Sequence, residues 1–173
     1  MTEPDQPISL TSFALSYDAT EDRLRCRVHW RDGTRDLMLT RRLAASLMTC
    51  LARRLERQAQ GHATFDHIEL TRGGAQGTGR AERKGGPRSR TPDAVRRLDA
   101  LVLDGRSAGA ALRLDDAAGQ RYRLVLDRAS AHHLLDSLFR RARQADWHLE
   151  GAVPWLAAAV GAVAADQLST PHH

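Results

Sequence analysis

The chain has 173 residues, of which 42% are hydrophobic, 5% aromatic and 27% charged, and its formal net charge is +5. This length suits one domain, or two small units that share a core. The only two cysteines, Cys26 and Cys50, form neither a Cys-x-x-Cys motif nor a disulfide framework, which excludes the disulfide-rich secreted class. Residues 1–10 lack the pattern of a signal peptide, and the longest apolar stretch, 153–165, is too short to span a bilayer. We therefore expect a cytoplasmic protein without membrane insertion.

The positive charge is concentrated in one segment. Residues 71–97 carry eight bases and two acids, a net charge of +6, whereas residues 1–70 sum to 0 and residues 98–173 to −1. The same segment is rich in glycine and has no apolar periodicity, which is typical of a flexible linker. The expected organisation is a first unit (1–70), a flexible basic linker (71–97), a second unit (98–152), and a C-terminal helix and tail (153–173).

Two parts of the chain resemble each other. Residues 37–41 (Leu-Met-Leu-Thr-Arg) match residues 124–128 (Leu-Val-Leu-Asp-Arg), and the leucines and paired arginines that follow also align. Further on, residues 67–69 (His-Ile-Glu) match residues 148–150 (His-Leu-Glu). The spacing predicts two copies of one β-β-β-α-β unit. The alternative is a chance likeness, because amphipathic strand–helix pairs are common.

The first unit is expected to contain three strands, a helix and a fourth strand, at residues 8–17, 23–30, 34–39, 41–58 and 64–70. The second strand has the clearest signal, because Leu24, Cys26 and Val28 alternate with polar residues at the period of a half-buried strand. Asp32 and Gly33 predict a tight turn after it, and Thr40 is a suitable N-cap for the helix. The apolar stripe of that helix comprises Leu43, Leu47, Cys50, Leu51 and Leu55.

The second unit follows the same plan. Its strands are expected at residues 98–103, 110–114, 122–126 and 147–150, with a helix from Asp127, its cap, to Gln144. Its helical stripe comprises Ala131, Leu134, Leu135, Leu138 and Ala142. Pro154 suits the first turn of a further helix, which we expect to run to Asp166.

Neither unit is large enough to be stable alone, because a small sheet with one helix buries little apolar surface. We therefore expect an α+β fold in which tandem pseudo-symmetric β-β-β-α-β units pack together, with antiparallel sheets and helices on one face. The sequence leaves open whether the two units form one joined sheet or lie face to face.

The repeat itself contains a candidate metal site: His67 with Glu69, and His148 with Glu150. Residues two apart in a strand share a face, so each histidine could converge with its glutamate, and imidazole and carboxylate ligands suit zinc, manganese or iron. The alternative is that all four face solvent from edge strands. His132 and Asp136 share a helix face and resemble a catalytic pair, but polar residues on a solvent-exposed helix would give the same pattern.

Arginines suggest two candidate anion contacts. The linker could bind nucleic acid through Arg72, Arg80, Arg83, Lys84, Arg88 and Arg90, in a salt-dependent manner that does not read the base sequence. The alternative is a solubilising tether, since no aromatic residue among them could stack on bases. A second row, Arg23, Arg25 and Arg27, could bind phosphates, although nearby aspartates favour a solvated face. Cys26 and Cys50 are expected to be buried and inert.

The C-terminal helix is small and apolar. It could complete the core, or dock on a protein partner or a second copy of the chain through Trp155, Leu156 and Val160. No catalytic motif or cofactor-binding pattern is present, so we expect a non-catalytic interaction protein, such as an adaptor, assembly factor or accessory subunit. The single lysine, Lys84, beside 25 arginines indicates a GC-rich bacterial genome. Two alternatives stay open: a nucleic-acid-binding accessory protein and a metal-dependent enzyme.

Overall fold

A computed structural model describes residues 6–73, 96–104 and 110–168 of the chain. Its strands are β1 (Ile8–Ser9), β2 (Ser12–Asp18), β3 (Arg23–Trp30), β4 (Gly33–Leu39), β5 (Arg96–Asp104), β6 (Ala110–Asp116) and β7 (Arg121–Leu126). Its helices are α1 (Arg41–Ala59), α2 (Ala63–Gly73), α3 (Arg128–Gln144), the short 3-10 helix η2 (Glu150–Ala152) and α4 (Pro154–Leu168). The predicted α+β class is confirmed.

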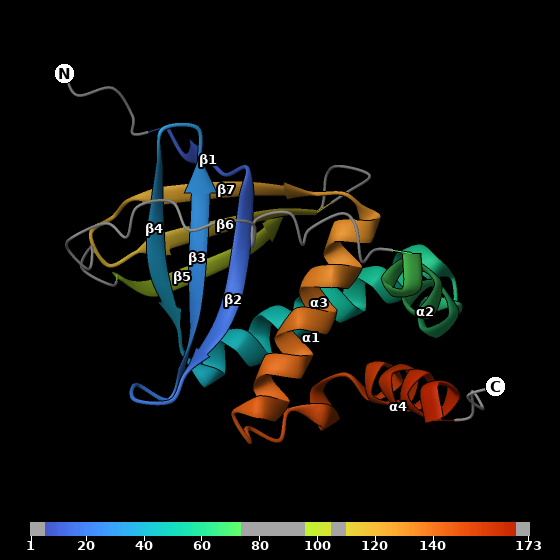
Figure 1. The fold of residues 1–173 in the computed structure, drawn as a ribbon. Helices are drawn as coiled ribbons and strands as arrows, with labels where there is room; N and C mark the ends of the chain where they lie inside the picture. Colours follow the sequence, from blue (N-terminus) through green and yellow to red (C-terminus); the bar gives the residue numbers. More distant parts are fainter. Residues whose placement is uncertain (1–5, 74–95, 105–109, 169–173) are drawn as a thin grey trace.

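The sheet consists of two antiparallel three-stranded groups. β2, β3 and β4 form one and β5, β6 and β7 the other, and Figure 1 shows the two groups crossing each other. A short parallel pairing of β4 with β5 joins them, which gives the strand order β1-β7-β6-β5-β4-β3-β2. Because the outermost strands β1 and β2 are consecutive in the chain, the sheet returns on itself: Leu10 N–H bonds to Arg123, and Thr11 N–H to His29.

The two long helices cross between the halves. α1 follows β4 but packs against β5, and α3 follows β7 but packs against β2, while α1 and α3 also pack on each other (Figure 1). Side-chain oxygens cap both helices, since Thr40 accepts from the Leu43 amide and Asp127 from the Ser130 amide. The sequence leaves open whether the halves share one sheet or lie face to face. Their strands form one continuous order, and α1 and α3 each pack on strands of the other half, so neither half has a core of its own.

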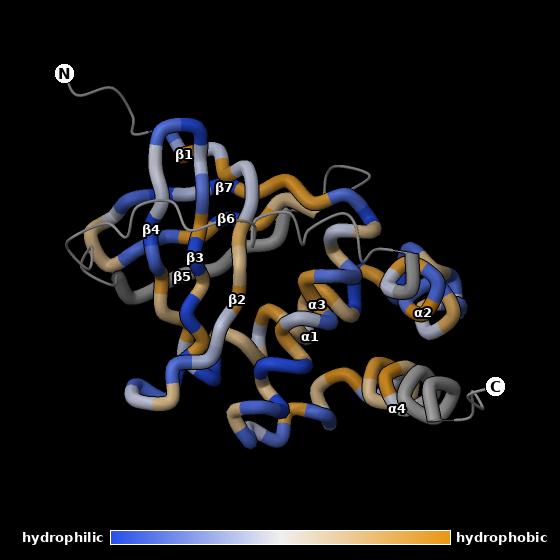
Figure 2. Tube along the Cα trace, viewed as in Figure 1, coloured by the Kyte–Doolittle hydropathy of each residue, from blue (hydrophilic) through white to orange (hydrophobic). Residues whose placement is uncertain are grey.

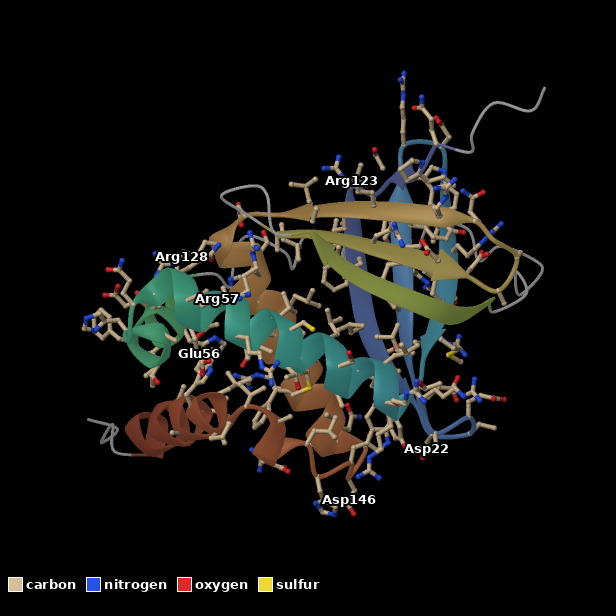
Figure 3. The ribbon with its side chains drawn as sticks, turned by 180° about the vertical axis from the view of Figure 1, so that it is seen from behind. Asp22, Glu56, Arg57, Arg123, Arg128 and Asp146 are labelled. Atoms are coloured by element: carbon tan, nitrogen blue, oxygen red, sulfur yellow. The ribbon has the colours of Figure 1, made fainter. Side chains whose placement is uncertain are left out.

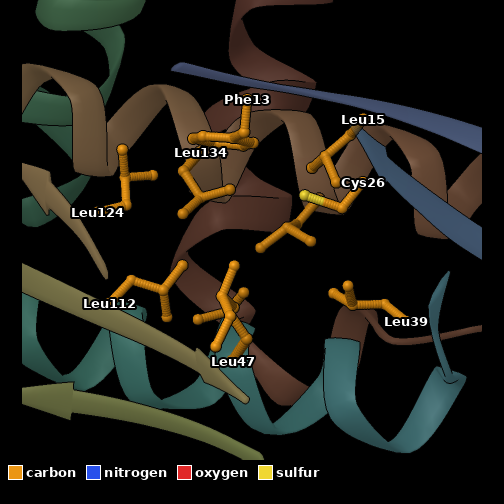
Figure 4. Close-up of a pocket in the computed structure, with 10 residues that line it drawn as sticks. Phe13, Leu15, Cys26, Leu39, Leu47, Leu112, Leu124 and Leu134 are labelled. Atoms are coloured by element: carbon orange, nitrogen blue, oxygen red, sulfur yellow. The ribbon is translucent and has the colours of Figure 1, made fainter. Parts of the chain in front are cut away.

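One apolar core joins the halves. It takes alternate residues of the strands and the stripes of α1 and α3, and leucine is its commonest residue. A small cavity within it is lined only by apolar side chains, among them Phe13, Leu112 and Leu134 (Figure 4). Such a lining offers no polar group to orient a ligand, so we assign the cavity to the core rather than to a binding site.

The remaining helices, α2 and α4, pack beside α1 and α3, and Leu156 of α4 belongs to the apolar core. We call α2 and α4 together the α2–α4 lobe (residues 63–73 and 154–168). The two helices pack on each other, and α2 also contacts α3 and α1. Figure 2 shows hydrophobic colouring at the start of α4, on the periphery of the molecule. The helix begins at Pro154, where the sequence predicts it.

The fourth strand predicted for each unit is wrong. Residues 64–70 lie in α2, where Ala63 and His67 are buried one helical turn apart. Residues 147–150 do not form a strand, because Asp146 and His148 have φ of 55° and 50° and the chain then enters η2. Each half is therefore β-β-β-α with a further helix.

The predicted linker is also bounded differently. Its first residues, 71–73, are the last turn of α2, and its last two, Arg96 and Arg97, begin β5. Residues 74–95 lie outside the described part of the chain.

Candidate functional site

Two buried histidines meet where α2, α3 and α4 come together. His67 of α2 is 2% exposed and His132 of α3 is 0% exposed. Their Nδ1 atoms are 3.1 Å apart, and their ring centroids 5.3 Å apart. Hydrogen bonding through these atoms requires one histidine to donate and the other to accept. Buried polar contact of this kind sets the site apart from the leucine core.

Side chains of α3 and α4 complete the cluster. Asp136 Oδ1 lies 3.7 Å from His67 Nε2, and Asp136 Oδ2 accepts a hydrogen bond of 2.7 Å from Arg140 Nε. The indole of Trp155 meets both imidazole rings edge-on, at centroid distances of 5.7 and 6.5 Å. The buried His67 Nε2, His132 Nε2 and Trp155 Nε1 atoms have no hydrogen-bond partner among the described residues.

The 3.1 Å contact between the Nδ1 atoms leaves open which ring donates. If His67 carries its proton on Nε2, toward the Asp136 carboxylate, its Nδ1 accepts the hydrogen bond that His132 Nδ1–H donates. His132 Nε2 is then an unprotonated acceptor. Burial lowers the pKa of His132 to about 4, with further contributions from His67 in its protonated form, Arg128 and His133, so this imidazole is neutral at neutral pH.

Two charged pairs flank the histidines. Burial would raise the pKa of Asp136, but the nearby His67 imidazole and the hydrogen bond from Arg140 outweigh it and lower the pKa overall. Nearby, Arg128 of α3 donates to Asp66 of α2. The joint between α2 and α3 is therefore polar and ionic.

Only part of this cluster follows from the sequence. The spacing pairs His132 with Asp136 and suggests that both lie on the surface, but His132 is fully buried and its hydrogen-bond partner is His67. The signal that would have revealed the pair is helical: if residues 63–71 form a helix, Ala63 and His67 lie on one face. A helix with one apolar face packs that face against another element, and α2 packs against the side of α3 that carries His132.

The predicted metal site is not formed. Glu69 is exposed on α2, because residues two apart on a helix point in different directions. His148 is exposed and its Nε2 lies 3.3 Å from Asp146, while Glu150 begins η2. No group of three or more histidine, cysteine, aspartate or glutamate side chains within 6–73, 96–104 and 110–168 is placed to hold a metal ion.

Two of the three arginines in the row on β3, Arg25 and Arg27, are paired with aspartates. Arg27 makes a two-fold hydrogen bond to Asp36, at 2.7 and 3.0 Å, and Arg25 pairs with both Asp18 and Asp36. Carboxylates that already hold these guanidinium groups leave little charge for a phosphate. Of the linker bases, Arg72 lies in α2, and the other five, Arg80, Arg83, Lys84, Arg88 and Arg90, lie outside the described residues.

The cysteines differ from each other. Cys26 is buried, and this burial, with a contribution from Asp36, raises the pKa of its thiol to about 12, which makes it unreactive. Cys50 is exposed, so its predicted place on the buried stripe of α1 is wrong. The stripe turns slightly away from it, through Leu47, Met48 and Leu51.

Two polar junctions fasten the halves at opposite ends of the molecule. In one, Asp22 Oδ1 accepts from Tyr17 OH at 2.9 Å and from Trp147 Nε1 at 3.0 Å. In the other, Arg35 donates to Tyr122 OH at 3.1 Å, and Tyr122 OH donates to Asp116 at 3.3 Å. Each junction satisfies the polar end of an aromatic ring whose face packs on the core, so both are structural.

The predicted partner contacts on α4 are only partly available. Leu156 is fully buried within the chain, so it cannot contact a partner, and Trp155 and Val160 are half-buried. The exposed positions up to residue 161 are Pro154, Ala158 and Gly161.

Comparisons of the chain with protein-family models, with curated proteins and with solved structures find no significant match in any of the three. In the part of the chain that the structure describes, no helix is both long enough and apolar enough to cross a membrane.

Proposed function

We propose that this chain is a non-catalytic interaction protein of the bacterial cytoplasm, an adaptor, assembly factor or accessory subunit, and that the α2–α4 lobe is its protein-binding surface. The observation that carries the proposal is the character of α4. Its sequence, Pro-Trp-Leu-Ala-Ala-Ala-Val-Gly-Ala-Val-Ala-Ala-Asp-Gln-Leu, is apolar almost throughout, although the helix lies at the periphery. Helices that are apolar on every side are usually covered on every side.

The exposed residues of the lobe support this assignment. Pro154, Ala158 and Gly161 are exposed on α4. On the neighbouring helix α2, Phe65 is 60% exposed, one of only two large hydrophobic side chains exposed to this degree among the described residues. Exposed aromatic and small apolar residues on adjacent helices suit an apolar helix or sheet face of another protein.

A strand-addition mode of binding has less support. The outermost strands of the sheet are consecutive in the chain, and the helices α1 and α3 pack beside β5 and β2. β2 is an edge strand that pairs with β3, but α3 packs beside it, so the helices are the better candidate.

Pulling down partners with matched variants tests the proposal. Phe65 and Val125 are equally exposed, at 60%, but Val125 lies on β7, away from the lobe. We expect one stoichiometric partner to be recovered with the wild-type chain and with Val125→Glu, and to be lost with Phe65→Glu and with Ala158→Arg, at unchanged melting temperature. Equal recovery with all four proteins, or turnover of a substrate by the purified chain, would contradict the proposal.

The proposed duplication has topological support. Both halves have the element order β-β-β-α followed by a further helix, both long helices begin one residue after a side-chain cap, and each packs on the other half. We infer that the halves are copies of one unit related by a pseudo-twofold axis. The histidine pair breaks this symmetry, because the repeat aligns His132 with Ala45 of α1.

Nucleic-acid binding is the second candidate. The observation that favours it lies on the outer face of β6 and β7, where Arg113 and Arg123 are directly opposite each other (Figure 3 labels Arg123). Arg113 is paired with Asp115 at 3.3 Å, so Arg123 is the arginine of this pair that an anion would contact. Binding in electrophoretic shift assays that falls steeply with salt, and falls again when Arg123 is changed to serine, is the outcome this candidate requires.

A further inference from the structure

We propose that the α2–α4 lobe is an acid-released element, in which proton uptake at the buried His67–His132 pair detaches α2 from α3. The inference concerns only how the lobe is attached to the core, so it does not rest on the proposed function. It is carried by the geometry of the joint, which differs in kind from the rest of the molecule.

The lobe is attached through both of its helices. α2 contacts α3 and α1, while α4 packs on α2 and on the neighbouring η2 and places Leu156 in the apolar core. Across the contact with α3, the specific interactions are the histidine hydrogen bond, the approach of His67 to Asp136, and the hydrogen bond from Arg128 to Asp66. All three depend on groups that carry or exchange protons.

An added proton has an unfavourable destination. When His132 Nδ1–H donates to His67, His132 Nε2 is the nitrogen free to take up a proton, and it is buried without a hydrogen-bond partner beside the indole of Trp155. A proton there creates a cation in a side chain that is 0% exposed. A second proton, on His67 Nδ1, would set two N–H groups against each other across 3.1 Å and break the hydrogen bond. Buried charges without partners are costly, so both steps favour a form in which water reaches the rings.

The surrounding charges do not compensate. On α3, Asp136 is paired with Arg140 and approaches His67, and Arg128 and His133 add positive charge. On α2, Asp66 is held by Arg128. On α1, Glu56 and Arg57 lie near α2 but are exposed to solvent (Figure 3). The described side chains of α4, up to residue 161, include no ionisable group. No unpaired carboxylate among these residues faces His132.

The sign and the range of the effect follow from the two protonation equilibria. The closed form holds the pKa of His132 at about 4, whereas a solvated histidine has a pKa of 6.5. The open form therefore binds the proton first, so closure is fully favoured above pH 6.5 and is weakened progressively as the pH falls toward 4. Between pH 7 and pH 5 the opening equilibrium constant should rise roughly 20-fold.

Hydrogen–deuterium exchange of the full chain at pH 7 and pH 5, corrected for intrinsic exchange rates, tests the inference. We expect the protection of amides 62–71 to fall roughly 20-fold at pH 5, while that of α1 changes little. In the double variant His67→Leu/His132→Leu, the pH dependence of α2 should vanish. In His133→Leu, which changes the neighbouring half-buried histidine, it should remain. Unchanged protection of α2 in the wild type, or an equal loss in α1, would overturn the inference.

An NMR titration of the wild-type histidine rings gives a second readout that does not require the double variant to fold. We expect His132 to titrate well below pH 6.5, together with shifts of α2 amides. Titration of His132 near pH 6.5 with no change in α2 would equally overturn the inference.

Discussion

Helix α3 faces two different neighbours, and the contrast shows how this fold separates stability from adjustability. Toward the core that it shares with α1, it buries a stripe of small and large apolar residues: Ala131, Leu134, Leu135, Leu138, Phe139 and Ala142. Toward α2 it offers Arg128, His132 and Asp136, each in contact with a polar group. The same helix is therefore an apolar partner on one side and an ionisable one on the other.

We call the apolar packing of α3 with α1 the core joint, and the polar packing of α3 with α2 the α2 joint. The two joints differ in what they contribute to stability. A buried leucine contributes about 2 kcal/mol through the area that it removes from water, and this contribution does not depend on pH. A buried hydrogen bond contributes about 1 kcal/mol net, because it replaces bonds to water. The core joint should therefore set the global stability, and the α2 joint should set the position of the lobe and its response to protons.

The largest expected effect is in the core joint. Leu138 is fully buried and borders the apolar cavity, so Leu138→Ala removes contacts that the core cannot recover by collapsing. We expect the free energy of unfolding to fall by about 3 kcal/mol. Urea unfolding should show one transition, since both halves share this core. Val125→Ala, at an exposed position on β7, should change stability by less than about 0.5 kcal/mol. Two separate transitions would refute the shared core.

A smaller loss is expected at the junction formed by Asp22. Asp22→Ala leaves the Trp147 Nε1–H without its acceptor and places alanine at a φ of 47°, which it adopts poorly. We expect a loss of about 2 kcal/mol. Asp22→Asn keeps a side-chain acceptor and tolerates this φ, so its cost should be clearly smaller. Equal costs for the two variants, measured by urea unfolding, would mean that the hydrogen bonds do not fasten the halves.

The elements that form the core joint could be predicted from the sequence, whereas those that form the α2 joint could not. The strand β3 has the predicted bounds, because eight residues of strict alternation define both its ends and its buried face. The caps Thr40 and Asp127 could be predicted because a hydroxyl or carboxylate directly before an apolar helical stripe is the usual start signal of a helix. These signals are local, and the core joint is built from them.

The polar joint could not be predicted, because it depends on contacts between distant segments. Residues 64–70 are too few to distinguish a strand from a helix by periodicity, which is why the sequence places His67 on the wrong kind of element. Once α2 is a helix, it covers the flank of α3, and this covering buries His132. The positive φ of Asp146 and His148 likewise leaves no periodic trace in the sequence.

The helix caps allow the two halves to be compared at matched positions. Thr40→Ala and Asp127→Ala should each lower the unfolding free energy by about 1 kcal/mol, with Asp127 contributing slightly more because its charge faces a helix N-terminus. The Ser130 amide lowers the pKa of Asp127, so this contribution is present above the ordinary value of 3.8 and lost as the pH falls through the lower folded value. Urea unfolding should show the cost of Asp127→Ala shrinking in acid while that of Thr40→Ala stays constant; the reverse would contradict the assignment.

The smallest effect on global stability should come from Arg128, and it separates the two roles of the α2 joint. Its pairing with Asp66 is partly exposed, so Arg128→Met should lower the free energy of unfolding by at most about 0.5 kcal/mol. Locally, α2 loses a contact with α3, so its amides should exchange several-fold faster at pH 7.

The charge of Arg128 also helps to lower the pKa of His132. Without that charge the pKa of the closed form moves toward 6.5, and the ratio of opening between pH 5 and pH 7 should shrink. Faster exchange of α2 with an unchanged ratio would show that Arg128 only holds the helix and does not act on the histidine.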